Sequence, residues 1–192
     1  MNVYREMQIM DEQGMKRALL KITHEILARN EGPQNLVLLG LQTRGVFLAR
    51  RIAGIVKDIE GVEVPVGVLD VTMYRDDFRD KTRQPLAKVT SIPFTVDGTN
   101  IVIVDDVFYT GRTIRAAMDA IMDYGRPRYI RLAVLVDRGH RELPICADYI
   151  GKTIKTQPNQ EITVRMKEVP EDGIDEVKLL TLDNGGESWH SG

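Results

Sequence analysis

Apolar residues gather in four short runs along the chain, and these runs predict buried strands. Each run is rich in Leu, Ile and Val, and continuous apolar stretches of this length are typical of strands covered on both faces of a parallel sheet. The runs are residues 36–41, 64–73, 101–104 and 129–136. Pro65 interrupts the second run near its start, and Ile162 begins a further predicted strand.

Helical periodicity separates the predicted strands. Asp11 is suited to cap a helix over residues 11–29, in which Met15, Leu19, Ile22 and Ile26 share one face. Two further helices are predicted over residues 46–53 and 114–122. The alternation of strands and helices predicts an α/β fold with a mainly parallel sheet flanked by helices on both faces.

The run at residues 101–104 leads into the segment with the most informative chemistry. Asp105 and Asp106 follow it and place two carboxylates where the strand reaches water. Residues 107–113 then lead directly into a helix, so backbone N–H groups and the positive end of the helix dipole suit a phosphate, and Gly111 permits close approach. A phosphate site beside carboxylates that suit sugar hydroxyls predicts a ribose 5-phosphate at the strand end. The alternative interpretation is an ordinary strand followed by a solvated turn.

This segment resembles the signature with which type I phosphoribosyltransferases bind phosphoribosyl pyrophosphate (PRPP). The apolar strand, acidic pair, Thr-Gly step and helix occur here in the family's order. The resemblance implies that PRPP is bound by Asp105, Asp106, Val107, Phe108, Tyr109, Thr110, Gly111, Arg112 and Thr113. It also implies catalytic roles for both aspartates, a small hood region beside the sheet, and Mg²⁺ held mainly through PRPP, with no metal site made of protein residues.

A second strand-to-helix turn contains Thr43, Arg44 and Gly45, which match the family's pyrophosphate loop. The resemblance implies that all three bind PRPP and that Arg44 is catalytic, because it receives the departing diphosphate. Residues 74–85 are highly charged without an apolar period, which indicates either disorder or a lid over the active site. The family has a flexible loop here, and this chain's version looks short around residues 83–85.

The loop after the fourth run, residues 137–144, resembles that of one branch of the family. Members of this branch are uracil phosphoribosyltransferases that also regulate pyrimidine biosynthetic genes by binding messenger RNA. The resemblance implies base binding by Asp137 and Arg138, with apolar cover from Ile162. It implies conversion of uracil and PRPP to UMP and pyrophosphate, with transcription attenuation that responds to UMP or UTP. Two alternatives remain open: a phosphoribosyltransferase for purines or orotate without RNA binding, and an RNA-binding regulator without enzymatic activity.

A stripe of basic residues marks the candidate RNA surface. Such a stripe is usually the solvated face of an amphipathic helix, but the family uses a localised basic face of an oligomer. The candidates are Arg17, Lys21 and His24 on the first helix, with His140, Arg141 and Lys152 farther along. The implied partner is a pyrimidine operon leader mRNA, and the implied assembly is a homo-oligomer, a dimer or higher. We expect Lys21→Ala and Arg141→Ala to weaken RNA binding while largely sparing uracil transfer.

Composition limits the remaining possibilities. A chain of 192 residues suits one domain, assigned here to residues 1–182, followed by a polar tail at 183–192. The net charge of −2 argues against a broad nucleic-acid surface but leaves room for a local patch. The single Cys146 excludes an internal disulfide framework, and the sequence has no run of 18 apolar residues that would span a membrane. We expect a cytoplasmic protein.

Overall fold

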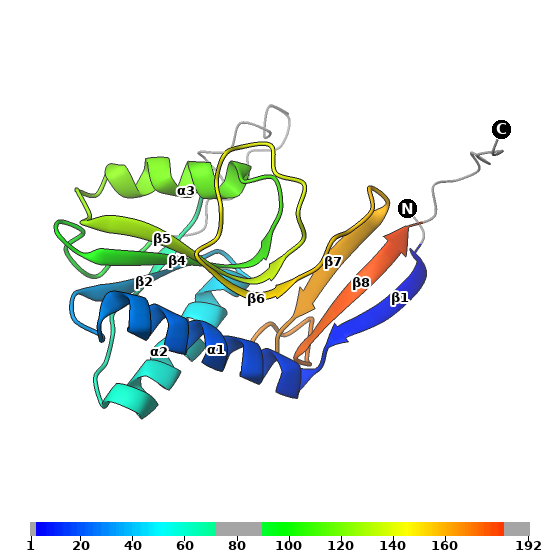
Figure 1. Cartoon of the computed structure of the whole chain (residues 1–192), viewed down its shortest axis with the longest axis horizontal. Helices are drawn as coiled ribbons and strands as arrows, with labels where there is room; N and C mark the ends of the chain where they lie inside the picture. Colours follow the sequence, from blue (N-terminus) through cyan, green and yellow to red (C-terminus); the bar gives the residue numbers. More distant parts are fainter. Residues whose placement is uncertain (1–2, 72–89, 183–192) are drawn as a thin grey trace.

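The computed structural model describes residues 3–71 and 90–182, which form two sheets and three helices (Figure 1). The larger sheet has five parallel strands in the order β3-β2-β4-β5-β6. Its strands are β2 (Leu36–Leu41), β3 (Val66–Leu69), β4 (Asn100–Phe108), β5 (Tyr129–Asp137) and β6 (Tyr149–Thr153). The smaller sheet is antiparallel in the order β1-β8-β7, with β1 (Val3–Met10), β7 (Gln160–Arg165) and β8 (Glu176–Leu182).

Helices cover both faces of the parallel sheet, as the sequence predicted. The helices are α1 (Glu12–Asn30), α2 (Arg44–Glu60) and α3 (Arg112–Met122). In Figure 1, α1 and α2 lie on one side of the sheet and α3 lies on the other. Alternate strand residues serve the two faces: Leu38 and Val102 join the core with α1 and α2, whereas Leu39 and Ile103 join the core with α3. Because successive strand side chains point to opposite faces, burial on both faces requires apolar residues at every position.

The ends of α1 confirm the predicted local signals. The Asp11 side chain accepts a hydrogen bond from the Gly14 amide at 2.7 Å and so caps the helix. The helix ends at Glu31, which adopts a left-handed conformation with φ of 58°, and the Gly32 amide donates to the Leu27 carbonyl. The start of α1 therefore follows from a side-chain preference that acts within a few residues, whereas the left-handed conformation at its end is one that a glutamate rarely adopts.

Four elements have boundaries that differ from the sequence predictions. β3 is shorter than the expected strand at residues 64–73, because Pro65 has no N–H to donate and residues 72–73 lie outside the described part. β4 continues to Phe108, since its ladder with β5 extends to the pair Phe108 and Asp137. α2 and α3 begin earlier than predicted, at Arg44 and Arg112, so these two arginines belong to first helical turns.

The smaller sheet packs onto the same core as the parallel sheet. Val164 and Met166 near the end of β7 and Val177 on β8 are buried in the cluster that contains Leu38 and Val102. This sheet stands beside the carboxyl ends of the parallel strands (Figure 1), where the family's hood region is expected. The predicted lid at residues 74–85 and the predicted tail at residues 183–192 lie outside the described residues. In the described part, no helix has the length and apolar character that a membrane crossing requires.

Candidate active site

Three segments meet at the carboxyl ends of the parallel strands. The turn between β2 and α2 abuts β4, because a Cβ atom added to Gly45 would lie 2.3 Å from the Val104 carbonyl oxygen. The loop after β5 reaches the end of β4, where the Arg138 amide donates to the Phe108 carbonyl at 3.1 Å and the Glu142 amide donates to the Thr110 carbonyl at 3.0 Å. The parallel order of the strands therefore brings these three segments together at one edge of the sheet.

Asp105 and Asp106 lie near the end of β4, and the amide of the following residue holds each carboxylate. The Asp106 amide donates to Asp105 Oδ1 at 3.0 Å, and the Val107 amide donates to Asp106 Oδ1 at 2.9 Å. Burial raises the pKa of the Asp106 carboxyl above its ordinary value, although its hydrogen bond with the Asp105 side chain and the charge of Arg44 act in the opposite direction. Positive charge that enters this site therefore favours the ionised form of Asp106.

A pocket of about 190 Å³ extends from Asp105 to the start of α3. It is lined by Asp105, residues 107–111, Thr113 and Ile114. Gly111 precedes α3 with φ of 95°, a conformation that other residues rarely adopt, and the Thr110 hydroxyl accepts from the Arg112 amide at 3.3 Å. The start of α3 thus lies at the pocket, where the positive end of the helix dipole favours an anionic group such as a phosphate.

Two arginines fix the loop after β5. Arg138 is buried, donates to Thr156 Oγ1 at 3.2 Å and to the Gln160 carbonyl at 2.5 Å, and lies 4.1 Å from the centre of the Tyr109 ring. Arg141 pairs with Asp137 at 2.5 Å, donates to the Tyr109 carbonyl and stacks over the Phe108 ring at 3.4 Å. Both arginines therefore bind the candidate base loop to the PRPP segment.

His140 and Ile162 take less direct positions. His140 adopts φ of 60°, and its Nε2 lies 2.7 Å from the Thr156 carbonyl oxygen. Ile162 belongs to β7 of the smaller sheet, two residues beyond the Gln160 carbonyl that accepts from Arg138, and it packs against the main core. Ile162 therefore lies two residues from a contact of the base loop, but its own apolar contacts are with the core.

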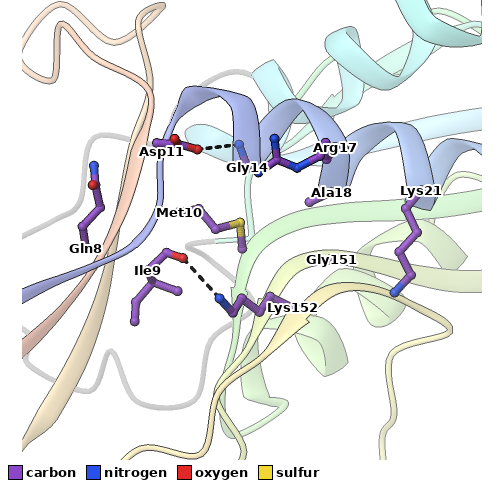
Figure 2. Close-up of a pocket in the computed structure, with 10 residues that line it drawn as sticks. All are labelled: Gln8, Ile9, Met10, Asp11, Gly14, Arg17, Ala18, Lys21, Gly151 and Lys152. Atoms are coloured by element: carbon purple, nitrogen blue, oxygen red, sulfur yellow. Dashed lines mark hydrogen bonds between the residues drawn. The ribbon is translucent and has the colours of Figure 1, made fainter.

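A separate pocket of about 500 Å³ contains part of the predicted RNA surface (Figure 2). We call it the α1–β6 groove, and its lining residues are Gln8, Ile9, Met10, Asp11, Gly14, Arg17, Ala18, Lys21, Gly151 and Lys152. Lys21 donates to the Ile150 carbonyl at 2.9 Å, and Lys152 donates to the Ile9 carbonyl at 3.2 Å. Three cations from two elements therefore share one groove.

The other predicted RNA residues lie elsewhere. His24 is exposed on α1 but does not line the groove. His140 and Arg141 lie on the candidate base loop, and the Arg141 side chain is only 22% exposed. The six predicted residues therefore form a groove triad of Arg17, Lys21 and Lys152, one outlying histidine, and a pair within the active-site loops.

Several site residues carry no signal in the sequence. Thr156 is contacted by Arg138 and His140. Asp172 forms a bidentate ion pair with Arg44, with N–O distances of 2.9–3.1 Å. Arg44 and Asp172 are separated by 128 positions in the chain. Local patterns do not report on such contacts, because only the docking of the smaller sheet brings these residues together.

The acidic pair offers oxygen donors of the kind that Mg²⁺ prefers. Among the described residues, no group of three or more His, Cys, Asp or Glu side chains could hold a metal ion. The Asp105 and Asp106 carboxylates are hard oxygen donors beside a phosphate-sized pocket. This donor set suits Mg²⁺, which is usually bound by one or two carboxylates together with substrate phosphates and water.

Comparison with known proteins places the chain in a family. The model of the phosphoribosyl transferase domain matches residues 7–171. The chain therefore belongs to the phosphoribosyltransferase family, as its PRPP signature indicated.

Within this family the chain is similar to proteins named Bifunctional protein PyrR. It is 57% identical over 173 residues to the relative from Pelotomaculum thermopropionicum, covering 90% of this chain and 94% of the relative. It is 54% identical over 168 residues to a relative from Listeria monocytogenes, covering 86% of this chain and 92% of the relative. This is the branch that the loop at residues 137–144 resembles.

Solved structures agree with the fold. A hypoxanthine phosphoribosyltransferase from Trypanosoma cruzi superimposes with a TM-score of 0.68 at 16% identity, covering 92% of this chain and 97% of the other. One from Staphylococcus aureus gives a TM-score of 0.67 at 14% identity, covering 95% and 94%. At these identities the likeness establishes the type I phosphoribosyltransferase fold alone.

Proposed function

We propose that the protein converts uracil and PRPP to UMP and pyrophosphate, and that it also binds a pyrimidine operon leader mRNA to attenuate transcription in response to UMP or UTP. One observation carries the proposal: the acidic pair, the start of α3 and the Arg44 turn converge at one sheet edge in a chain similar to proteins named Bifunctional protein PyrR. The proposed place of action is the cytoplasm.

In the proposed reaction, uracil N1 attacks the C1 carbon of the ribose, the bond from that carbon to the pyrophosphate oxygen breaks, and the N1 proton is lost. Asp105 and Asp106 hold the ribose hydroxyls and stabilise positive charge that develops on the sugar. The first turn of α3 binds the 5-phosphate, while Arg44, with Thr43 and Gly45, receives the pyrophosphate. Mg²⁺ bound mainly by PRPP, with Asp105 and Asp106 as the available carboxylates, supplies charge neutralisation for the leaving group.

Base selection is assigned to the loop after β5. Recognition of the base edge is assigned to the segment of Asp137 and Arg138 because this loop resembles that of the PyrR branch, while the side chains of Arg138 and Arg141 bind the loop to Tyr109. Ile162 is the proposed apolar cover. A panel of uracil, hypoxanthine, guanine and orotate with PRPP and Mg²⁺ tests the assignment, with turnover expected for uracil. Turnover of a purine or orotate in place of uracil would favour the alternative phosphoribosyltransferases.

RNA binding is assigned to the α1–β6 groove. Its three cations offer phosphate contacts, so RNA affinity should fall steeply with salt. We expect Lys21→Ala to weaken binding of the leader RNA in a gel-shift assay and to leave uracil transfer unchanged. Lys57→Ala is a matched control, because the Lys57 side chain is 59% exposed, comparable to 56% for Lys21, but lies on α2 outside the groove. Equal RNA affinity for both variants would refute the groove as the RNA site.

Nucleotide control follows from linkage. If UMP tightens RNA binding by some factor, RNA must tighten UMP binding by the same factor. A gel shift with and without UMP measures the first factor, and calorimetric titration of UMP with and without RNA measures the second. A homo-oligomer, at least a dimer, would double the groove, and light scattering of the purified protein tests that assembly.

A further inference from the structure

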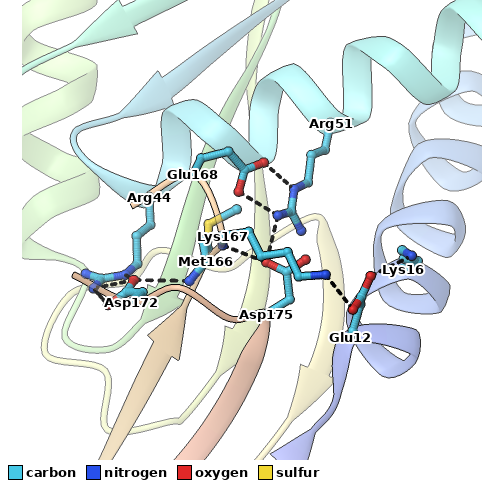
Figure 3. Close-up of polar contacts among 9 residues, drawn as sticks. All are labelled: Glu12, Lys16, Arg44, Arg51, Met166, Lys167, Glu168, Asp172 and Asp175. Carbon is cyan, nitrogen blue, oxygen red and sulfur yellow. Dashed lines mark hydrogen bonds and ion pairs between the residues drawn. The ribbon is translucent and has the colours of Figure 1, made fainter. Parts of the chain in front are cut away.

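The loop between β7 and β8, residues 166–175, lies against α2 and carries a carboxylate to the proposed pyrophosphate site (Figure 3). Arg44 donates from Nε to Asp172 Oδ2 at 3.1 Å, and from Nη2 to Oδ1 at 3.0 Å and to Oδ2 at 2.9 Å. The Asp172 side chain is 10% exposed, whereas that of Arg44 is 32% exposed. A largely buried negative charge is therefore in direct contact with the arginine that the leaving group would meet.

The geometry leaves Arg44 able to bind a phosphate while Asp172 stays in place. Asp172 occupies the edge of the guanidinium formed by Nε and Nη2. Arg44 Nη1 makes no hydrogen bond to any residue within the ranges 3–71 and 90–182. A guanidinium has five donors in a fixed plane, so the second edge can receive a pyrophosphate oxygen without displacement of the carboxylate.

The Asp172 carboxylate is held independently of Arg44. The Met166 amide donates to Asp172 Oδ2 at 3.1 Å, and the Asp172 amide donates to the Val169 carbonyl at 2.9 Å. The same loop is anchored to α2 at a second point, where Arg51 donates to Glu168 at 2.6 and 2.8 Å and to Asp175 at 2.7 Å. Asp172 is thus a fixed negative charge and not a side chain that swings onto Arg44.

We propose that Asp172 is a positioning residue that holds Arg44 and offsets its charge, and thereby limits how tightly the enzyme binds pyrophosphate. This inference rests on the proposed role of Arg44. The negative charge of Asp172, separated from the pyrophosphate only by the Arg44 guanidinium, opposes anion binding in a region of reduced dielectric. Binding that is equally strong in the reactant and product complexes does not raise turnover, and slow product release commonly limits it. Weaker retention of pyrophosphate therefore favours its departure after transfer.

The test is Asp172→Asn, which removes the charge and keeps an oxygen that can accept from Arg44 Nε. Calorimetry with magnesium pyrophosphate on the full chain measures binding without any base, and product inhibition against PRPP measures it during turnover. We expect pyrophosphate to bind about tenfold more tightly to Asp172→Asn. Turnover should fall while the KM for uracil stays near that of the parent. Unchanged or weaker pyrophosphate binding would overturn the inference.

Two further variants separate charge from loop structure. Glu168→Gln alters the same loop at its contact with Arg51, so it controls for general loosening and should leave pyrophosphate affinity within about twofold of the parent. Asp172→Glu keeps the charge and should retain affinity close to that of the parent. If Asp172→Glu also binds pyrophosphate tightly, charge is not the cause and the inference fails, even where Asp172→Asn folds poorly.

Arg44→Ala distinguishes failure of this inference from failure of the proposed site. If Arg44→Ala binds pyrophosphate as tightly as the parent, Arg44 is not the pyrophosphate residue, and both the site assignment and the role of Asp172 are wrong. If Arg44→Ala weakens binding but Asp172→Asn has no effect, the site assignment stands and only the role of Asp172 is lost.

Discussion

Replacement of Gly45 by alanine should separate the pyrophosphate turn from the acidic pair. The added Cβ would lie 2.3 Å from the Val104 carbonyl oxygen and 3.3 Å from the Asp105 Cα, and contacts under 3.0 Å essentially never occur for a real Cβ. The start of α2 and the end of β4 must therefore move apart by at least about 0.7 Å. Because both neighbours are backbone, no side-chain rotation relieves the contact.

The expected consequences differ in size for stability and for activity. Overpacking of this kind typically costs about 1–3 kcal/mol of the free energy of unfolding. A displacement near 1 Å between groups that bind the two ends of the reacting bond costs about 100-fold in rate. We therefore expect kcat/KM for PRPP in Gly45→Ala to fall about 100-fold, in a protein that remains folded in urea titrations.

Gly54→Ala is the matched control, because Gly54 lies on the same helix and an added Cβ there meets no atom within 4 Å. It should stabilise the protein by roughly 0.5–1 kcal/mol, since alanine is a better helix former, and leave kcat/KM unchanged. If Gly45→Ala keeps the kcat/KM of the parent, contact between this turn and β4 does not set the geometry of the site.

Three other predictions follow from the contacts around the site. Asp105→Asn combined with Asp106→Asn should abolish transfer without unfolding the domain, and full activity at an unchanged Tm would contradict the ribose role. Arg141→Ala should lower kcat/KM by about 10- to 100-fold, because Arg141 connects the base loop to the PRPP segment. It should also lower any RNA affinity. Retention of full transfer would restore the sequence expectation. Burial alone would raise the pKa of Asp175, but its hydrogen bonds from Arg51 and the Lys167 amide outweigh burial and lower that pKa. The stability that the pair of Arg51 and Asp175 contributes is therefore present above the unfolded-state pKa of Asp175. It is lost as the pH falls below about 4. The difference in unfolding free energy between the parent and Arg51→Met, measured by urea titration, should therefore shrink from pH 6 to pH 3, and a constant difference would refute the pairing.

The sequence by itself predicted most of the elements and the acidic, phosphate-favouring character of residues 101–113. The Asp11 cap and the apolar run before Asp105 act over a few residues, so their signals are complete in the sequence. Convergence at the carboxyl ends of the strands follows from the parallel order that alternating strands and helices impose. The family signature adds the identity of the ligand to this local information.

Contacts between distant segments were decided only by the tertiary structure. The pair of Arg44 and Asp172 joins α2 to the β7–β8 loop, and the α1–β6 groove unites Arg17 and Lys21 with Lys152. The sequence predicted Arg141 to belong to a basic RNA-binding surface, whereas in the fold its side chain contacts Asp137 and the Phe108 ring. The physical reason is that periodicity and capping depend on neighbours in the chain, whereas the partner of a charged side chain depends on which elements pack together. The sequence therefore determined which chemistry is available at the sheet edge, and packing of the smaller sheet determined which charge stands beside Arg44.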